Sequence, residues 1–263
     1  MLKTRFITAL AGAPLLLFFV YLGKYWYGIV VLVIALIGMR EFYGLMRKGG
    51  WIPAETAGYL FIPLLFFVVY RENLPELISL WVLIFAAYNL IPVIFYGRIQ
   101  FWESVFSFWG LMYTGGLASF LLYIRGLPEG FYLTVFLLLV IWVGDIMAYL
   151  VGSAVGKNPL APLLSPKKTI EGTVGGLMGS MLVGMLLSIY FPVEYLNLLT
   201  GALLGLFTGV AGALGDLVQS ALKRSVNVKD SGDILPGHGG ILDRFDSLLF
   251  AAPFFYIYLY YLI

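Results

Sequence analysis

The residues best suited to chemistry are crowded into one segment, residues 220–246, which reads SALKRSVNVKDSGDILPGHGGILDRFD. Carboxylates can hold hard divalent cations, and lysine and arginine side chains can bind phosphate oxygens. The spacing therefore indicates a site for a phosphorylated substrate that is associated with a metal. Its candidate residues are the acids Asp230, Asp233, Asp243 and Asp246, the bases Lys223, Arg224, Lys229 and Arg244, and His238, the only histidine in the chain.

The glycines of this segment favour a loop that wraps around an anion. Gly239 and Gly240 directly follow His238, and a turn of this kind leaves backbone N–H groups accessible to a phosphate. A helix that is expected to begin near Asp246 would add the positive potential of its N-terminus. The alternative is a solvated loop in which Asp243 or Asp246 only caps that helix.

A second polar segment, residues 156–173, carries the adjacent bases Lys167 and Lys168. These side chains are candidates for binding substrate phosphates or the headgroups of anionic lipids. The alternative is an ordinary basic loop on the cytoplasmic side of a membrane. Other connectors in the chain are short, so the chemistry is expected on these two polar segments.

Three further acids, Asp145, Asp216 and Glu103, lie within or beside apolar stretches. An acid inside a membrane helix is costly and is by default a functional candidate. We expect Asp145, Asp216 and Asp246 near one membrane surface, where they could hold one or two divalent ions, with Asp243 in or next to the same site. Glu103 is interpreted as a capping or interfacial residue at the start of its helix.

The elements that must position these residues are membrane helices. Apolar residues make up 61% of the chain and charged residues only 11%, against about 25% charged in soluble domains. A span needs about 20 mostly apolar residues, so the sequence predicts an all-α, multi-pass membrane protein with nine spans. The predicted spans are 5–22, 26–46, 57–70, 77–96, 102–123, 131–151, 172–191, 196–218 and 247–263.

The distribution of basic residues predicts the orientation. Basic residues concentrate on the cytoplasmic side of membrane proteins. With a cytoplasmic N-terminus and an external C-terminus, 13 of the 16 lysines and arginines lie inside, and only Lys24, Arg71 and Arg125 lie outside. The small net charge of +2 gives no support for a nucleic-acid partner. We interpret residues 1–130 as scaffold helices that give lipid access and residues 131–263 as helices that carry the catalytic loops.

Small residues recur at helical spacing in the seventh and eighth predicted spans. Gly201, Gly205 and Gly209 form a repeated G-x-x-x-G pattern, and the preceding span carries Gly172 with Gly176 and Gly175 with Gly179. Such spacing allows helix backbones to approach closely. We therefore expect the seventh and eighth spans to pack tightly against each other.

Residues 220–246 resemble the signature of the CDP-diacylglycerol synthases, also called phosphatidate cytidylyltransferases. The signature runs from Ser through Lys-Arg, Lys-Asp and Pro-x-His-Gly-Gly to Asp-Arg-x-Asp, and the chain matches it without departure. The segments around 145–156 and 165–172, together with Gly215-Asp216, also look like this family. The matching residues are Ser220, Lys223, Arg224, Lys229, Asp230, Gly232, Pro236, His238, Gly239, Gly240, Asp243, Arg244 and Asp246.

The resemblance implies that CTP and phosphatidic acid react to give CDP-diacylglycerol and pyrophosphate, with Mg²⁺ required. It implies a multi-pass protein of the cell (inner) membrane, among membrane lipids, with its active site facing the cytoplasm, and it leaves a homodimer open. The expected catalytic residues are Asp216, Asp246, Lys223, Arg224, Lys229, Asp230, His238 and Arg244. The expected substrate-binding residues are Lys167, Lys168, Ser220, Gly239 and Gly240, and the expected metal ligands are Asp145, Asp216, Asp243 and Asp246.

Two rival functions remain at this point. A CTP-dependent polyprenol or dolichol kinase has related motifs, but it would release CDP instead of pyrophosphate. An ion-coupled transporter would use Asp145 and Asp216 as ion sites, yet it would place acids near the middle of the bilayer. Since a lipid phosphate is already deprotonated near neutral pH, the transferase needs no strong general base. His238 is therefore predicted to order the loop or donate a hydrogen bond.

Overall fold

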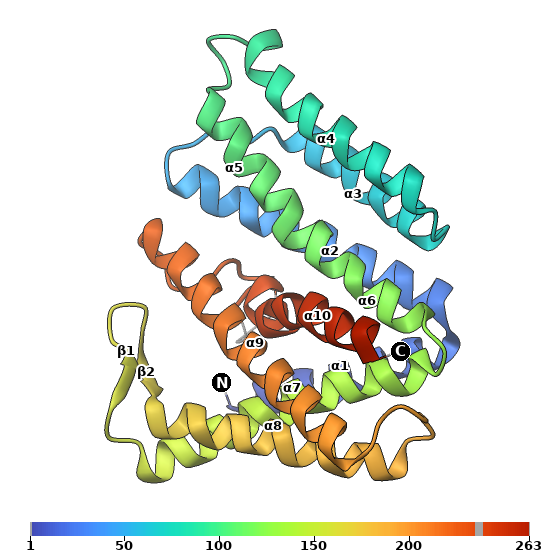
Figure 1. The fold of residues 1–263 in the computed structure, drawn as a ribbon. Coiled ribbons are helices and arrows are strands. Elements are labelled where there is room, and N and C mark those ends of the chain that lie inside the picture. Colours follow the sequence, from blue (N-terminus) through green and yellow to red (C-terminus); the bar gives the residue numbers. More distant parts are fainter. Residues whose placement is uncertain (1, 235–238, 263) are drawn as a thin grey trace. The chain divides into compact units, whose positions relative to one another are not determined.

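The computed structural model describes the backbone of residues 2–234 and 239–262 and the side chains of residues 12–234 and 239–261. Each of the nine predicted spans overlaps a helix in this part of the chain (Figure 1). The fifth corresponds to two α-helices joined by a π-helical turn, η1. The helices are α1 (Leu2–Leu22), α2 (Lys24–Lys48), α3 (Glu55–Tyr70), α4 (Leu74–Ile94), α5 (Phe101–Leu111), η1 (Met112–Gly116), α6 (Leu117–Gly126), α7 (Gly130–Val155), α8 (Ile170–Tyr190), α9 (Leu198–Ser225) and α10 (Leu242–Leu262).

Six helices of the described residues are long and apolar enough to cross a membrane, namely α2, α4, the continuous stretch Phe101–Gly126, α7, α8 and α9. Two shorter apolar helices, Gly12–Leu22 and Glu55–Tyr70, accompany them. On α4, large apolar side chains such as Val82, Leu83 and Val93 stay exposed. Exposed apolar surface of this extent is expected where helices face lipid. The protein is therefore an all-α, multi-pass membrane protein.

The chain forms two compact units. Unit 1 comprises Met1–Tyr123 and Ser225–Arg244, and unit 2 comprises Ile124–Arg224 and Phe245–Ile263. The segment that resembles the family signature is thus shared between the units. This grouping concerns spatial packing, and the functional division at residues 130 and 131 stays a prediction.

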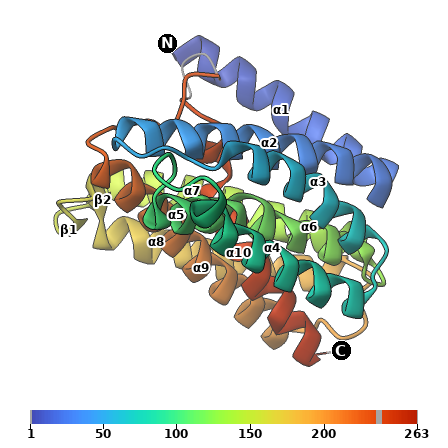
Figure 2. The same ribbon diagram turned by 90° about the horizontal axis from the view of Figure 1, so that it is seen from above.

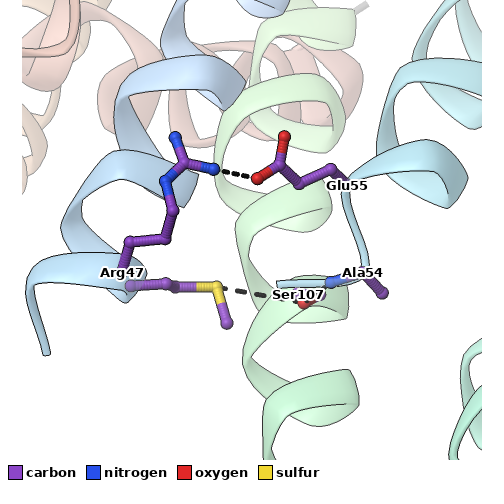
Figure 3. Close-up of polar contacts among 5 residues, drawn as sticks. Arg47, Ala54, Glu55 and Ser107 are labelled. Carbon is purple, nitrogen blue, oxygen red and sulfur yellow. Dashed lines mark hydrogen bonds and ion pairs between the residues drawn. The ribbon is translucent and has the colours of Figure 1, made fainter. Parts of the chain in front are cut away.

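Polar contacts fix the helix connections of unit 1. Arg47 in the last turn of α2 pairs with Glu55 at the start of α3, and the Ser107 hydroxyl of α5 accepts a hydrogen bond of 2.9 Å from the Ala54 N–H (Figure 3). Glu103 caps α5 by accepting from the Gln100 N–H at 2.6 Å, and its other oxygen accepts from the Ile52 N–H at 2.8 Å. The interpretation of Glu103 as a capping residue is confirmed.

Glycines bring the helices of unit 2 together. Helices α7 and α8 lie side by side in both views (Figures 1 and 2), and a Cβ atom added to Gly176 would lie 2.9 Å from the Gly144 carbonyl oxygen. A Cβ atom added to Gly201 of α9 would lie 2.6 Å from the Gly184 carbonyl oxygen of α8. The predicted tight packing of the seventh and eighth spans is confirmed. The glycine pairs of α8 itself, however, face α7.

A β-hairpin between α7 and α8 was not predicted from the sequence. Strands β1 (Pro159–Ala161) and β2 (Ser165–Thr169) pair in antiparallel fashion, with Pro159 opposite Thr169 and Ala161 opposite Ser165. At the start of α8, the Glu171 carboxylate accepts hydrogen bonds from the Lys157 and Asn158 N–H groups at 3.1 and 3.2 Å. The Thr169 hydroxyl caps α8 by accepting from the Gly172 N–H at 3.1 Å.

Candidate active site

A group of charged residues lies in unit 2, around the Asp246 carboxylate. Asp246 is only 7% exposed, and Asp216, Lys223 and Asp145 lie close enough to interact with it electrostatically. Asp216 also forms an ion pair with Lys168 and lies 3.5 Å from the Ser220 hydroxyl. Three of the four predicted metal-binding acids therefore gather with two of the predicted phosphate-binding lysines. We call Asp145, Asp216, Asp246, Lys168 and Lys223 the Asp246 cluster.

Glycines on α9 allow α10 to bring Asp246 into this cluster. A Cβ atom added to Gly215 would lie 2.8 Å from the Asp246 carbonyl oxygen, and one added to Gly212 would lie 3.6 Å from the Ser247 Cβ. Within α9, Asp216 and Lys223 are seven residues apart, which is two helical turns. The glycine-rich sequence thus lets α10 pack directly on the helix that carries Asp216.

The β-hairpin places Lys168 next to Asp216. Lys168 lies near the end of β2, whose connection to α8 is held by Glu171 and Thr169 as described above. On the α9 side, the Arg224 guanidinium donates a hydrogen bond of 3.2 Å to the Leu164 carbonyl oxygen in the hairpin turn. Arg224, a predicted catalytic residue, therefore anchors the hairpin that positions Lys168.

Gln219 is a buried polar residue on the same helix. Its side chain is fully buried, and neither its amide oxygen nor its amide nitrogen has a hydrogen-bond partner among the residues that the structure describes. Since a buried polar group without a partner costs free energy, it calls for an explanation. Asp216 precedes it by three residues and Lys223 follows by four, so all three lie on adjacent parts of one face of α9. Helical spacing thus places the Gln219 amide beside two members of the Asp246 cluster.

The preceding part of the signature segment forms a separate polar group in unit 1. The Asp243 Oδ2 atom accepts hydrogen bonds from the Ser231 N–H at 2.8 Å, the Ser231 hydroxyl at 2.9 Å and the Gly240 N–H at 3.0 Å. The Glu41 carboxylate of α2 accepts from the Ser231 hydroxyl at 3.0 Å, the Ile241 N–H at 2.8 Å and the Leu242 N–H at 2.9 Å. We call Glu41, Ser231 and Asp243, with the amides that they bind, the loop clamp.

The hydrogen bonds of the loop clamp bear on the roles predicted for Asp243 and Gly240. Asp243 was predicted at or next to the metal site, yet it uses its Oδ2 atom to hold the loop ends together. Gly240 was predicted to offer its N–H group to an anion, but that N–H donates to Asp243. Gly239 has a φ of +82°, a left-handed backbone that suits glycine.

The contacts described for the Asp246 cluster and the loop clamp do not include the remaining predicted residues. Lys167, Lys229, Asp230 and Arg244 are exposed at the surface of the described residues. His238 lies outside the described residues, as do Pro236 and Gly237. Their predicted roles in catalysis or substrate binding stay predictions.

The sequence analysis missed Ser231 of the loop clamp, and it also missed Glu41 and Gln219. Glu41 lies inside the second predicted span, so the rule that an acid within a span is a functional candidate would have selected it. Gln219 lies between Ser220 and the glycine-rich part of α9, and an amide carries no comparable signal. Only the fold reveals that Glu41 accepts three hydrogen bonds, and that the Gln219 amide has no partner among the described residues.

Comparisons of the sequence with known proteins show the family of the chain. Residues 3–262 match the sequence model of the cytidylyltransferase family. The phosphatidate cytidylyltransferase of Bacillus subtilis (strain 168) is 35% identical to the chain, with 98% of the chain and 97% of the relative covered. The proteins of the same name from Synechocystis sp. (strain ATCC 27184 / PCC 6803 / Kazusa) and Staphylococcus aureus (strain COL) are 33% and 34% identical, with 97% and 96% of the chain and 95% and 96% of the relatives covered. The chain therefore belongs to the cytidylyltransferase family.

Proposed function

We propose that this protein joins CTP to phosphatidic acid, giving CDP-diacylglycerol and pyrophosphate for phospholipid synthesis. The observation that carries the proposal is the Asp246 cluster, in which a buried carboxylate, two further acids and two lysines meet in a membrane protein of this family. Carboxylates and lysines together suit a reaction between two phosphorylated molecules, because both the metal and the phosphates need partners of opposite charge.

In the proposed reaction, a phosphate oxygen of phosphatidic acid attacks the α-phosphorus of CTP. The bond between the α- and β-phosphates breaks, and pyrophosphate leaves with the electron pair. The attacking oxygen is already anionic, so the protein has to align the two substrates and neutralise charge that develops in the transition state. We assign the neutralisation to Lys168 and Lys223, and the orientation of the substrates to Asp216 and Asp246.

Mg²⁺ fits the donor set of the Asp246 cluster. Within the described residues, histidine and acidic side chains form no group of three or more that is placed to hold one ion. Mg²⁺ is commonly bound by one or two carboxylates together with substrate phosphates, so Asp216 and Asp246 would suffice to hold it. When bound, Mg²⁺ would supply charge neutralisation at the phosphate oxygens. A second ion and the participation of Asp145 and Asp243 are part of the same proposal.

The proposed topology has nine spans, a cytoplasmic N-terminus and an external C-terminus, in the cell membrane. The 13-to-3 distribution of basic residues supports it, and it gives the two polar segments access to cytoplasmic CTP. Reporter fusions after residue 263 should score as external, and fusions in the 156–169 loop should score as cytoplasmic. A C-terminal reporter that scored cytoplasmic would contradict this topology.

The reaction is tested with purified protein, CTP labelled in the cytosine ring, phosphatidic acid in mixed micelles, and Mg²⁺. The expected result is a lipid-soluble cytidine product together with an equal amount of pyrophosphate. Release of CDP with a phosphorylated lipid alcohol, when an alcohol is supplied, would identify a CTP-dependent kinase instead. Absence of both products from folded protein would reject the proposed function.

A further inference from the structure

Glu41 is a buried acid whose two carboxylate oxygens both accept hydrogen bonds from the signature segment. It is 4% exposed, and it lies near the end of α2, some 190 residues before its hydrogen-bond partners. One oxygen accepts from the Ile241 N–H at 2.8 Å, while the other accepts from the Leu242 N–H at 2.9 Å and the Ser231 hydroxyl at 3.0 Å. All three partners are donors.

Two of these donors lie at the N-terminal end of α10, namely the Leu242 N–H and the Ile241 N–H directly before it. The first N–H groups of a helix have no acceptor within it, and α10 begins at Leu242. The positive end of the helix favours a carboxylate there. Glu41 therefore acts as an N-terminal cap for α10 that is supplied by a distant helix, in place of the local cap by Asp243 or Asp246 that the sequence suggested as an alternative.

The same carboxylate closes the signature loop. Ser231 marks one end of the loop and Gly240 marks the other, and two of the loop glycines, Gly232 and Gly240, leave space for Glu41. A Cβ atom added to Gly232 would lie 2.7 Å from the Glu41 Oε1 atom, and one added to Gly240 would lie 2.7 Å from its carboxyl carbon. The glycines of the signature thus serve partly to admit the Glu41 carboxylate.

We propose that Glu41 is a positioning residue for the cytidylyltransferase reaction, which fixes the loop ends 231 and 240–242 and the start of α10. This inference rests on the proposed function. Glu41 acts through the loop and does not touch substrate. Asp246 follows Leu242 by four residues, one turn along α10, so the cap also sets the point at which the helix that carries Asp246 begins.

The test compares Glu41→Gln with Glu103→Gln. Glu103 is a matched control because it is 5% exposed, belongs to the same unit and accepts from two backbone N–H groups, and these donors, Ile52 and Gln100, lie outside the signature segment. A glutamine at position 41 places an amide N–H₂ against N–H donors and removes the charge. Glu41→Asp, which keeps the charge on a shorter side chain, serves as the conservative variant.

Two measurements are made on each folded variant in detergent. Hydrogen–deuterium exchange of peptides that cover 231–242 reports the loop clamp directly and needs no substrate. Steady-state kinetics with CTP and phosphatidic acid report catalysis. Glu41→Gln should exchange faster in this segment and lose about 10- to 100-fold in kcat, the range seen when a residue that orients a site is removed. Glu41→Asp should recover part of the loss, and Glu103→Gln should keep wild-type kcat per folded molecule.

Unchanged exchange at 231–242 in Glu41→Gln would overturn the inference, and so would equal losses of kcat in the two glutamine variants. These failures differ from failure of the proposed function. In that case the wild-type protein itself would form no CDP-diacylglycerol, while the exchange experiment would still report whether Glu41 holds the loop.

Discussion

The two carboxylate groups of this protein differ in how their oxygens are used. In the loop clamp, Glu41 and Asp243 accept from backbone amides and one serine hydroxyl. In the Asp246 cluster, the acids meet lysine side chains and one another, and the buried amide of Gln219 on the same helix as Asp216 has no partner within the described part of the chain. The acids of the loop clamp are thus held by backbone N–H groups and the Ser231 hydroxyl, whereas the acids of the Asp246 cluster face charged side chains.

This difference distinguishes acids that hold the backbone of the loop in place from acids that are placed to interact with a substrate or a metal ion. A carboxylate that is held by backbone N–H groups is fixed and cannot turn toward a substrate without loss of those bonds. Acids of like charge that are placed together repel one another, and such an arrangement persists where a cation or substrate compensates for it. The comparison therefore predicts large catalytic effects with little structural cost in the Asp246 cluster.

The largest effect is expected for Asp246→Asn. The substitution keeps the size of the side chain but removes a buried charge, so activity should fall by about 10³-fold or more, as expected when electrostatic stabilisation at a reacting centre is lost. Thermal stability in detergent should stay equal or rise, because repulsion with Asp216 is relieved. Asp233→Asn, at an exposed position of the same segment, is the control. Near-normal turnover in Asp246→Asn would remove Asp246 from the reaction.

Lys168→Met should have the next largest effect. The change removes the ion pair to Asp216 and a positive charge near the substrate phosphates, so kcat/KM should drop by about 10²-fold. Separate titrations of CTP and phosphatidic acid show which substrate Lys168 binds, through the KM that rises. Lys157→Met removes an exposed lysine from the same segment and should leave both values unchanged. Wild-type kinetics in Lys168→Met would mean that the pair with Asp216 is only structural.

Gln219→Met tests whether the buried side-chain amide of Gln219 binds a ligand. Methionine fills a similar volume without polar atoms, and an unsatisfied buried amide costs about 1–3 kcal/mol, so thermal stability should rise or hold. If the amide binds substrate, kcat/KM should fall by about tenfold at the same time. Thr208→Val, also buried on α9, removes a hydroxyl that bonds to the Leu204 carbonyl oxygen and should leave kinetics unchanged. A more stable and fully active Gln219→Met would show that the amide has no ligand.

Much of this arrangement could be predicted because membrane helices follow local rules. Long apolar runs predicted the helices, glycine spacing predicted the contact between α8 and α9, and the shared depth of Asp145, Asp216 and Asp246 predicted that they gather. The interrupted fifth span also forms helix, since a π-helical turn at Met112–Gly116 absorbs the irregular glycine-rich sequence. In each case the signal is contained within one or two segments.

The parts that were missed depend on partners far apart in the chain. The β-hairpin is short and polar, and its stability comes from Glu171 and Arg224, which no strand pattern reveals. Glu41 meets Ser231 across 190 residues, so a single sequence gives no indication of the pairing. The sequence marked Asp243 as a possible metal ligand, but it gave no indication of the Ser231 and Gly240 N–H groups that donate to its Oδ2 atom.

The smallest effect is expected for His238→Gln. Glutamine keeps a donor and an acceptor but cannot titrate near neutral pH, whereas histidine ordinarily titrates near pH 6.5. The attacking phosphate oxygen is already deprotonated and pyrophosphate leaves without a proton, so a general base or acid has little to do. Activity should fall only a few-fold, and the pH–rate profile between about pH 6 and 9 should keep its shape. A loss as deep as that of Asp246→Asn, in protein that still binds CTP normally, would instead assign proton transfer to His238 and place it with the reacting residues of the Asp246 cluster.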